Sequence, residues 1–355
     1  MTENLNYLSR QLAAATADKK AVRIRGGGTK DWYGQALRGE ILDTRAYAGI
    51  ISYDPTELVI TVRCGTRLTD LEAALAEQNQ ILPFEPPRFG PASTIGGVVA
   101  SGLSGPRRPA VGAVRDFVLG AVLIDGKGET LHFGGQVMKN VAGYDVSRLL
   151  AGSMGILGLI AEISLKVLPK PFAEKTLRFE MNQADAIRHL NEWGGQPLPV
   201  SASAWQDGAL MLRLSGAQAA VQAAESKLGG EEVPEADTFW ENLRDQQTDF
   251  FTECKEPLAL WRISLPTVAP ALELPGEQLI EWGGALRWVK TDVEASTVRA
   301  AAAKAGGHAM LYRGGDKRVG VFHPLAPAVG RIHRNLKASF DPAGIINPGR
   351  MYPDF

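Results

Sequence analysis

The residue types between Gly90 and Asp116 are suited to holding a phosphate group. The segment carries glycines and hydroxyl side chains at Gly90, Gly96, Gly97, Gly102, Gly105, Gly112, Ser93, Thr94, Ser101 and Ser104. Backbone without a Cβ can approach a ligand closely, and its N–H groups can point at an anion. Apolar residues such as Ile95 and Leu103 are threaded through the segment, which indicates partial burial. We therefore predict a phosphate cradle, with tight packing of a glycine-rich turn as the alternative, because a glycine loop alone is a weak signal.

Two further glycine clusters lie on either side of this segment. Gly26–Lys30 (GGGTK) follows a predicted strand at 21–25, and Gly152–Gly158 (GSMGILG) precedes a predicted strand at 159–168. The first cluster fits a second phosphate cradle, with a simple hairpin turn as the alternative. The sequence contains no G-x-x-x-x-G-K-[ST] loop, and no G-x-G-x-x-G follows a strand, so the two common nucleotide fingerprints are absent.

The cysteines and histidines offer little metal or redox chemistry. Cys64 and Cys254 are the only cysteines, which excludes a disulfide framework and a cysteine-ligated iron–sulfur cluster within the chain. None of the five histidines is paired at the i, i+4 spacing. We therefore predict no metal site.

Length and composition indicate a globular protein of two domains. The chain has 355 residues, 45% hydrophobic and 22% charged, with a formal charge of −1. A net charge this close to zero gives no electrostatic reason to expect binding to nucleic acid or to an anionic membrane. We find no apolar run of the ~18 residues that a membrane span needs and no signal peptide, which favours a cytoplasmic setting.

The pattern of apolar residues predicts an α+β fold. Strands are expected at 57–64 and 117–124, and a helix at 69–78 that opens with the capping-box spacing of Thr69 and Glu72. Beyond Pro171 the composition shifts, and strand and helix units repeat. This second half predicts an antiparallel sheet with helices on one face, closed by a helix at 326–337.

The motifs in combination resemble the vanillyl-alcohol-oxidase type, or PCMH type, of FAD-binding flavoproteins. The resemblance rests on RGGGTK, PASTIGG, SGLSG, GAVRDFVLG, KNVAGYDVSRLLAGSMGILGLI and DPAGIINPGR. It covers roughly residues 1–172 and the last dozen. Within the family, the chain looks most like the FAD-binding subunits of bacterial glycolate oxidases. The resemblance implies a PCMH-type FAD-binding domain of two subdomains at 1–172, a small antiparallel α+β cap at 173–339, and a tail at 340–355 that returns to the flavin.

The resemblance also implies which residues hold FAD. The pyrophosphate is expected to contact Gly26, Gly27, Gly28, Thr29 and Lys30. The pyrophosphate and the flavin are both expected to contact residues of the central segment, namely Pro91, Ala92, Ser93, Thr94, Ile95, Gly96, Gly97, Gly102, Ser104, Gly105 and Asp116. The adenine and ribose side falls to Gly152, Ser153, Gly155, Leu157, Gly158 and Ile160, and the returning tail supplies Asn347 and Arg350.

Two departures from the family pattern change what is expected of the site. Thr29 and Lys30 stand where relatives with covalent flavin carry a histidine, so we predict FAD held without a covalent bond. The region from His308 to Asp316 looks like a remnant of a metal-binding element without its ligand histidines. Candidates for a catalytic base and a carboxylate-binding cation are the weakly indicated Arg313, His308, Tyr312 and His323, for which ordinary strand and loop roles fit equally well.

The function implied by the resemblance is oxidation of a 2-hydroxy acid such as glycolate to a 2-oxo acid within a complex. The implied partners are a sister FAD-containing catalytic subunit and an iron–sulfur subunit, which leave the chain cytoplasmic or peripheral to the inner membrane through those partners. Two alternatives remain open: a stand-alone FAD-dependent alcohol or sugar oxidoreductase, and a non-catalytic subunit that holds FAD for structural reasons.

Overall fold

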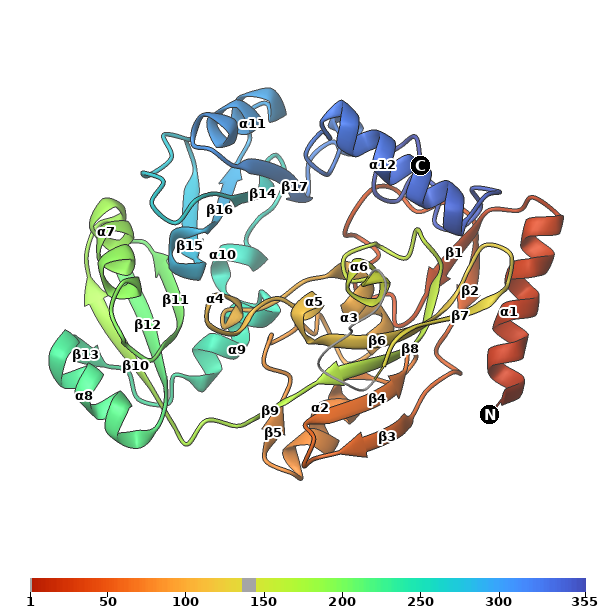
Figure 1. Ribbon diagram of the computed structural model, residues 1–355. Helices are drawn as coiled ribbons and strands as arrows, with labels where there is room; N and C mark the ends of the chain where they lie inside the picture. The colour runs from red at the N-terminus through yellow and green to blue at the C-terminus, as the bar shows by residue number, and fades with distance from the viewer. Residues whose placement is uncertain (1, 136–144) are drawn as a thin grey trace. The chain divides into compact units, whose positions relative to one another are not determined.

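The computed structural model describes residues 2–135 and 145–355 (Figure 1). The chain forms two compact units. The first unit comprises Met1–Ser104, Gly112–Pro169 and Pro324–Phe355, and the second comprises Gly105–Val111 and Lys170–His323. The chain therefore leaves and re-enters the first unit, so neither unit is one continuous stretch. The bounds of 1–172, 173–339 and 340–355 given above for the domains stay a prediction.

The first unit is built on a five-stranded sheet in the order β3-β4-β8-β6-β7. Its strands run antiparallel and comprise β3 (Ile50–Asp54), β4 (Val59–Arg63), β8 (Leu159–Lys166), β6 (Val118–Ile124) and β7 (Thr130–Gly134). Separate two-stranded sheets are formed by β1 (Val22–Arg25) with β2 (Glu40–Asp43), which run parallel, and by β5 (Gln80–Ile81) with β9 (Leu168–Pro169). The helices are α1 (Thr2–Ala17), α2 (Leu68–Ala76), α3 (Ile95–Ser101), α5 (Val114–Phe117), α6 (Val146–Leu149) and α12 (Pro327–Phe340).

The start of α2 differs from the expected capping box. The helix begins at Leu68, one residue before Thr69, and its N-cap Arg67 makes no side-chain cap hydrogen bond. Glu72 instead forms an ion pair with Arg88, whose Nε lies 2.8 Å from Glu72 Oε2. The capping prediction is wrong because burying Leu68, Leu71 and Leu75 sets where the helix begins, and this overrides the local capping preference.

The second unit is built on an eight-stranded sheet in the order β13-β10-β12-β11-β15-β16-β14-β17. Its strands are β10 (Ala173–Glu180), β11 (Val200–Gln206), β12 (Ala209–Gly216), β13 (Glu231–Glu232), β14 (Ala259–Ser264), β15 (Glu277–Glu281), β16 (Leu286–Thr291) and β17 (His308–Arg313). Its helices are α4 (Arg108–Val111), α7 (Gln183–Gly194), α8 (Gln218–Leu228), α9 (Asp237–Asp245), α10 (Asp249–Thr252), α11 (Ala295–Lys304) and the short turns Trp282–Gly284 and Lys317–Val319. All pairings in this sheet are antiparallel, as expected.

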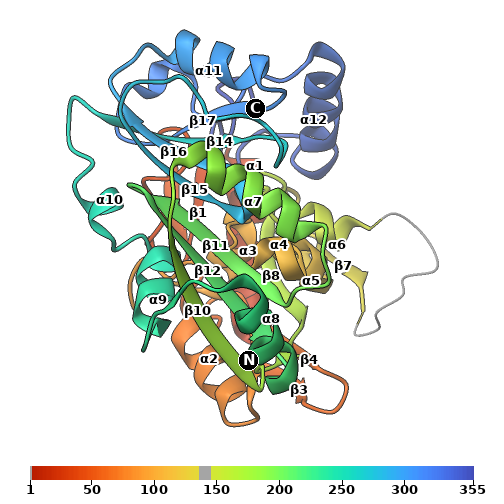
Figure 2. The same ribbon diagram turned by 90° about the vertical axis from the view of Figure 1, so that its left-hand side faces the viewer.

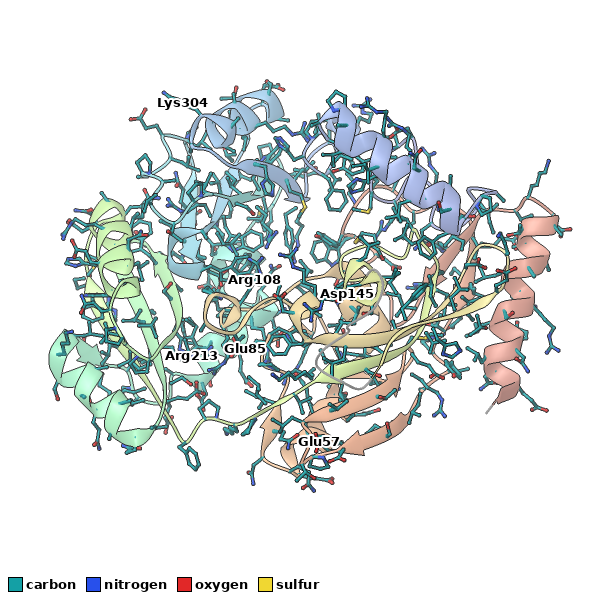
Figure 3. The ribbon with its side chains drawn as sticks, in the orientation of Figure 1. Glu57, Glu85, Arg108, Asp145, Arg213 and Lys304 are labelled. Carbon is teal, nitrogen blue, oxygen red and sulfur yellow. The ribbon has the colours of Figure 1, made fainter. Side chains whose placement is uncertain are left out.

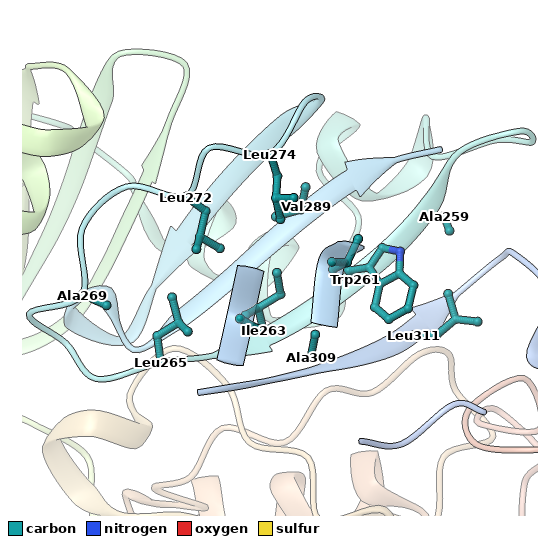
Figure 4. Close-up of a cluster of buried hydrophobic side chains, with 12 residues drawn as sticks. Ala259, Trp261, Ile263, Leu265, Ala269, Leu272, Leu274, Val289, Ala309 and Leu311 are labelled. Carbon is teal, nitrogen blue, oxygen red and sulfur yellow. The ribbon is translucent and has the colours of Figure 1, made fainter. Parts of the chain in front are cut away.

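The two faces of this sheet differ in chemistry. One face carries apolar side chains, mainly leucine, alanine and valine. Helices α7, α8 and α11 cover this face (Figures 1 and 2). Figure 4 shows the part of this core around Trp261 and Ile263. The opposite face carries charged and polar side chains, and α9 and α10 lie on it. There the indole Nε1 of Trp240 in α9 donates to Thr176 Oγ1 at 2.9 Å. The expectation of helices on one face is therefore wrong, because Trp240 of α9 and Phe251 of α10 pack against the second face as well.

Candidate functional site

The first glycine cluster leaves β1 with unpaired donors. In the part of the chain that the structure describes, the backbone N–H groups of Gly26, Gly27, Gly28 and Thr29 make no hydrogen bond. Glycine is required at Gly27, because a Cβ there would overlap the carbonyl of Ala92. Gly28 also needs to be glycine because its φ is +69°. The loop therefore presents a run of free amides on a backbone that side chains cannot crowd.

The central segment supplies α3 and the turn before it. Thr94 is the N-cap of α3, and Lys30 Nζ donates to Ser93 Oγ at 3.0 Å, which links the first cluster to this turn. The amides of Ile95 and Gly96 donate to the carbonyls of Thr66 and Cys64, which anchors the helix start to the body of the unit.

Gly97 differs from the other glycines of this segment. A Cβ on Gly96 would lie 2.7 Å from the Cβ of Cys64, so Gly96 serves packing. A Cβ on Gly97 would meet only Thr94 Oγ1, at 3.5 Å. The space in front of Gly97 is therefore open in the protein itself, and a side chain there would fill it.

The third cluster docks on the end of α3. The amides of Gly152 and Met154 donate to the carbonyls of Val99 and Ala100 at 2.9 and 2.8 Å. These are among the last carbonyls of the helix, which a helix end leaves without a partner. These hydrogen bonds hold the third cluster against the second. The order of the clusters along the sequence does not by itself imply this contact.

The C-terminal tail joins the first and third clusters through Asn347. Its Oδ1 accepts from Ile24 N at 2.8 Å, and its Nδ2 donates to Met154 O at 2.8 Å. The backbone continues this pairing, since Asn347 N donates to Val22 O. Gly155 makes room for the amide group, because a Cβ there would lie 2.8 Å from Asn347 Nδ2.

Arg350 has a related structural role. Its guanidinium donates to the carbonyls of Gln35, Lys30 and Asp31, and burial lowers its pKa to about 10. It remains charged at neutral pH and holds the turn that follows the first cluster.

A buried ion pair positions this tail, and sequence reasoning missed it. Lys337 Nζ lies 2.6 Å from Asp341 Oδ2 and also donates to the carbonyls of Ile156 and Ile346 at 2.7 Å. Asp341 in turn accepts from the amides of Ile345 and Ile346. Burial lowers the pKa of Lys337, and Asp341 opposes that shift. The i, i+4 spacing was visible in the sequence, but helix surfaces carry many such pairs.

The three clusters and the tail line two adjoining hollows in the first unit. Both hollows contact Gly26, Gly97, Met154 and Asn347. Predicted site residues that line one or both are Gly26, Gly27, Gly28, Thr29, Lys30, Thr94, Gly96, Gly97, Gly155, Gly158, Ile160, Asn347 and Arg350. Lining residues that were not predicted are Ile24, Arg25, Asp31, Leu37, Thr44, Cys64, Ala100, Ser101 and Met154.

The other predicted site residues lie outside these two linings. They are Pro91, Ala92, Ser93, Ile95, Gly102, Ser104, Gly105, Asp116, Gly152, Ser153 and Leu157. Ser104 and Asp116 accept hydrogen bonds from Val114 N and Ala113 N at the start of α5. Gly105 belongs to the second unit, where its carbonyl accepts from Trp282 Nε1 at 3.1 Å. Residues 139–144 of the KNVAGYD motif fall outside the described residues.

The catalytic candidates all lie in the second unit, around β17 and beyond. Gln246 joins two of them, because its Nε2 donates to the Tyr312 hydroxyl and its Oε1 accepts from Arg313 Nη2. The ring centroids of His308 and His323 lie 5.8 Å apart. Partial burial lowers the pKa of His308, and the charges of His323 and Arg262 add to this.

Within 2–135 and 145–355, no group of three or more His, Cys, Asp or Glu side chains is arranged to hold a metal ion. Over the same residues, none of the helices combines the length and apolar character that crossing a bilayer requires.

Comparison with known proteins identifies the cofactor. Residues 2–134 match the model of a family described as "FAD binding domain". A solved structure of alkyldihydroxyacetonephosphate synthase superposes with a TM-score of 0.66 at 17% identity, covering 96% of this chain and 74% of that one. This likeness confirms the α+β, PCMH-type fold. The open backbone in front of Gly97 and the free amides of Gly26–Thr29 fit such a ligand, and FAD is the cofactor.

Relatives of known name cover between about half and nearly all of the chain. The glycolate oxidase subunit GlcD of Bacillus subtilis is 32% identical over 52% of this chain and 39% of its own length. The D-lactate dehydrogenase of Archaeoglobus fulgidus is 25% identical over 98% of this chain and 89% of its own. The glycolate oxidase subunit GlcE of Escherichia coli is 51% identical over 98% of this chain and 97% of its own. A relative this similar over both full lengths shows that the chain belongs to the GlcE family of FAD-binding flavoproteins.

Proposed function

We propose that this chain is the FAD-binding subunit of a complex that oxidises glycolate, or a similar 2-hydroxy acid, to the 2-oxo acid. The carrying observation is the run of unpaired amides from Gly26 to Thr29 beside the open space at Gly97. Bound FAD supplies the two-electron oxidation chemistry. The proposal also draws on the GlcE relative and on relatives named D-lactate and D-2-hydroxyglutarate dehydrogenase.

The residues of the first unit bind and orient the cofactor in this proposal. The amides of Gly26, Gly27, Gly28 and Thr29 donate to the pyrophosphate, so that a buried anion is met by neutral backbone dipoles rather than by extra lysines. Gly97 lets the ligand approach the backbone closely. Asn347 and Arg350 hold β1 and the turn at Asp31 in place, and both also line the hollow that would take the cofactor.

The partners we propose are a sister FAD-containing catalytic subunit and an iron–sulfur subunit. The relative is itself named a subunit, which supports assembly. The two cysteines, one buried and one half-buried, supply no cluster ligands to carry electrons away. Partner subunits would then place the chain in the cytoplasm or at the face of the inner membrane.

The test is anaerobic addition of glycolate and D-lactate to the purified complex and, separately, to the FAD-loaded chain. We expect the flavin absorption of the complex to bleach, because each substrate molecule gives up two electrons and two protons. The isolated chain should turn over substrate poorly, since a base and a carboxylate clamp misplaced by ~1 Å cost ~100-fold in rate. If no 2-hydroxy acid bleaches the flavin of the complex, the proposal is refuted. If the isolated chain turns over substrate as fast as the complex, the catalytic site lies on this chain.

The mode of attachment is tested by acid precipitation. Thr29 and Lys30 offer no histidyl link, so we expect the yellow chromophore to leave with the supernatant. Colour that stays in the pellet would contradict non-covalent binding.

A further inference from the structure

A cluster of arginine and tryptophan side chains lies on the polar face of the eight-stranded sheet. The guanidinium carbon of Arg262, in β14, lies 5.1 Å from the ring centroid of Trp282 and 5.9 Å from that of Trp288. Arg108, in α4 (Figure 3), lies 4.3 Å from the same Trp282 ring. Two cations therefore share one aromatic ring, although like charges repel.

The register of the sheet determines which way Arg262 points. Its neighbours Trp261 and Ile263 belong to the apolar core under α11 (Figure 4). Because side chains alternate along a strand, Arg262 emerges on the opposite face. There its cross-strand partners are Trp288 of β16 and Met310 of β17.

Arg262 lacks a protein partner that would satisfy its charge. Within the described residues it makes no hydrogen bond and no ion pair. Arg313, by contrast, donates to Gln246, and Glu281 accepts from Trp288 Nε1 at 2.7 Å rather than pairing with Arg262. A guanidinium that rests on aromatic faces keeps its N–H edge available for a carboxylate.

Two histidines lie beside this arginine. His308 pairs across the strands with Ser264, so it lies on the same face as Arg262, two residues away along β14. His323 lies next to it. The lowered pKa of His308 leaves its imidazole largely neutral at pH 7, and a neutral imidazole can donate or accept a hydrogen bond with a hydroxyl.

We propose that Arg262 binds the carboxylate of a small 2-hydroxy or 2-oxo acid, with Trp282 and Trp288 fixing the guanidinium and His308 beside the hydroxyl or keto oxygen. This rests on the proposed function and gives its substrate a place on this chain. It also moves the carboxylate-binding cation from Arg313, which Gln246 holds, to Arg262.

The experiment is a tryptophan-fluorescence titration of the FAD-loaded full chain with glyoxylate, the 2-oxo acid that oxidation of glycolate would give. Inorganic phosphate and ethylene glycol serve as an anion without a carboxylate and a neutral molecule. The variants are Arg262→Gln, Arg262→Lys and Arg188→Gln, the last being a control on the exposed side of α7, where Arg188 pairs with Asp185. Flavin content and melting temperature are measured for each.

We expect Arg262→Gln to weaken glyoxylate binding by about tenfold or more, since a charge-assisted hydrogen-bond pair is lost. Arg262→Lys should weaken it less, and Arg188→Gln should leave it unchanged. If Arg262→Gln does not fold, Arg262→Lys decides, because lysine cannot reproduce the planar fork. Unchanged affinity in the Arg262 variants would overturn the proposal, as would phosphate or ethylene glycol binding as tightly as glyoxylate.

This outcome is separable from the proposed function. The titration reports binding to the isolated chain, whereas bleaching of the complex by glycolate reports oxidation. Bleaching that persists in complexes carrying Arg262→Gln, together with unchanged glyoxylate affinity, would remove the site and leave the function standing.

Discussion

The two units present polar groups in opposite ways. In the first unit the donors are backbone N–H groups exposed by glycines, and they follow one another along Gly26–Thr29. In the second unit they are side chains that the sheet gathers from separate strands, as with Arg262, Trp288 and His308. A backbone cradle meets an anion without burying a cation, whereas a side-chain site must hold its charge in place by packing.

The comparison extends to how each unit handles its buried charges. The first unit pairs Lys337 with Asp341 and satisfies the remaining donors and acceptors with backbone groups. The second unit also pairs buried cations, as Lys290 does with Glu277 and Arg107 with Glu174, but its half-buried Arg262 rests on aromatic rings. Fully satisfied charges serve structure, and a charge left without a partner is available for a ligand.

The largest effect expected is from Lys337→Met. This change leaves Asp341 buried without its cation, which should destabilise the protein by about 3–5 kcal/mol and lower the melting temperature by about 10 °C. Calorimetry of the variant measures this, with Lys304→Met at the exposed end of α11 as the control (Figure 3). Equal melting temperatures for both variants would show that the pair does not hold the tail.

The second largest effect is expected on the affinity for FAD and not on the stability of the protein. Gly97→Val places a branched side chain in the open space beside the cradle, so we expect FAD affinity to fall by about tenfold or more while the apoprotein melts normally. Gly195→Val is the matched control, since a Cβ there meets nothing closer than 3.6 Å and it lies in the second unit. Full flavin occupancy in Gly97→Val would remove this segment from the cofactor site.

These two residues show what the sequence could and could not predict about the site. The sequence predicted close backbone approach at Gly97 and in the Gly26–Lys30 loop, and the structure leaves open space at Gly97 and unpaired amides in the loop, while contact of these residues with FAD stays a prediction. The pairing of Lys337 with Asp341 was not readable, because its meaning comes from burial against Ile156, far away in the sequence. Arg262 was missed for the same reason, since only the register of β14 with β16 and β17 places it on a polar face.

A smaller effect is expected from Asn347→Asp. The substitution keeps the acceptor for Ile24 N but replaces the donor to Met154 O with a carboxylate oxygen, which should cost about 1–3 kcal/mol. Asn335→Asp makes the same chemical change on the exposed surface of α12, where the side-chain amide makes no hydrogen bond within the described residues. If both variants melt alike, Asn347 does not join the first and third clusters.

The smallest effect concerns Glu174 of the second unit. Burial raises the pKa of this carboxyl, but the charge and hydrogen bond of Arg107 and the charge of Arg213 outweigh it, so the pKa is lowered from 4.5. A lowered pKa means that stability is present above pH 4.5 and is lost as the pH falls below it. Glu174→Gln should therefore melt below the wild type at pH 7, and the difference should shrink below pH 4.5. Glu57 is exposed (Figure 3), so Glu57→Gln should change neither the melting temperature at pH 7 nor its dependence on pH.

The fold could be predicted in part for similar reasons. The strands at 22–25, 59–63 and 159–166 lie where apolar alternation and apolar runs predicted them. The cover of the second sheet was predicted for one face only, because the amphipathic pattern of α9 indicates that this helix packs on something but not on which face of the sheet it lies. The hydrogen bond from Trp240 to Thr176 depends on the place of β10 in the sheet, which the sequence of α9 does not reveal.

The most direct test of the account is amide hydrogen exchange of the first glycine cluster with and without FAD. The amides of Gly26, Gly27, Gly28 and Thr29 have no partner in the protein, so they should exchange fast in the apoprotein and become protected when FAD binds. A peptide from α7, in the second unit, should not change. Slow exchange already in the apoprotein, or no added protection in a chain loaded with FAD, would contradict the claim that these backbone donors hold the cofactor.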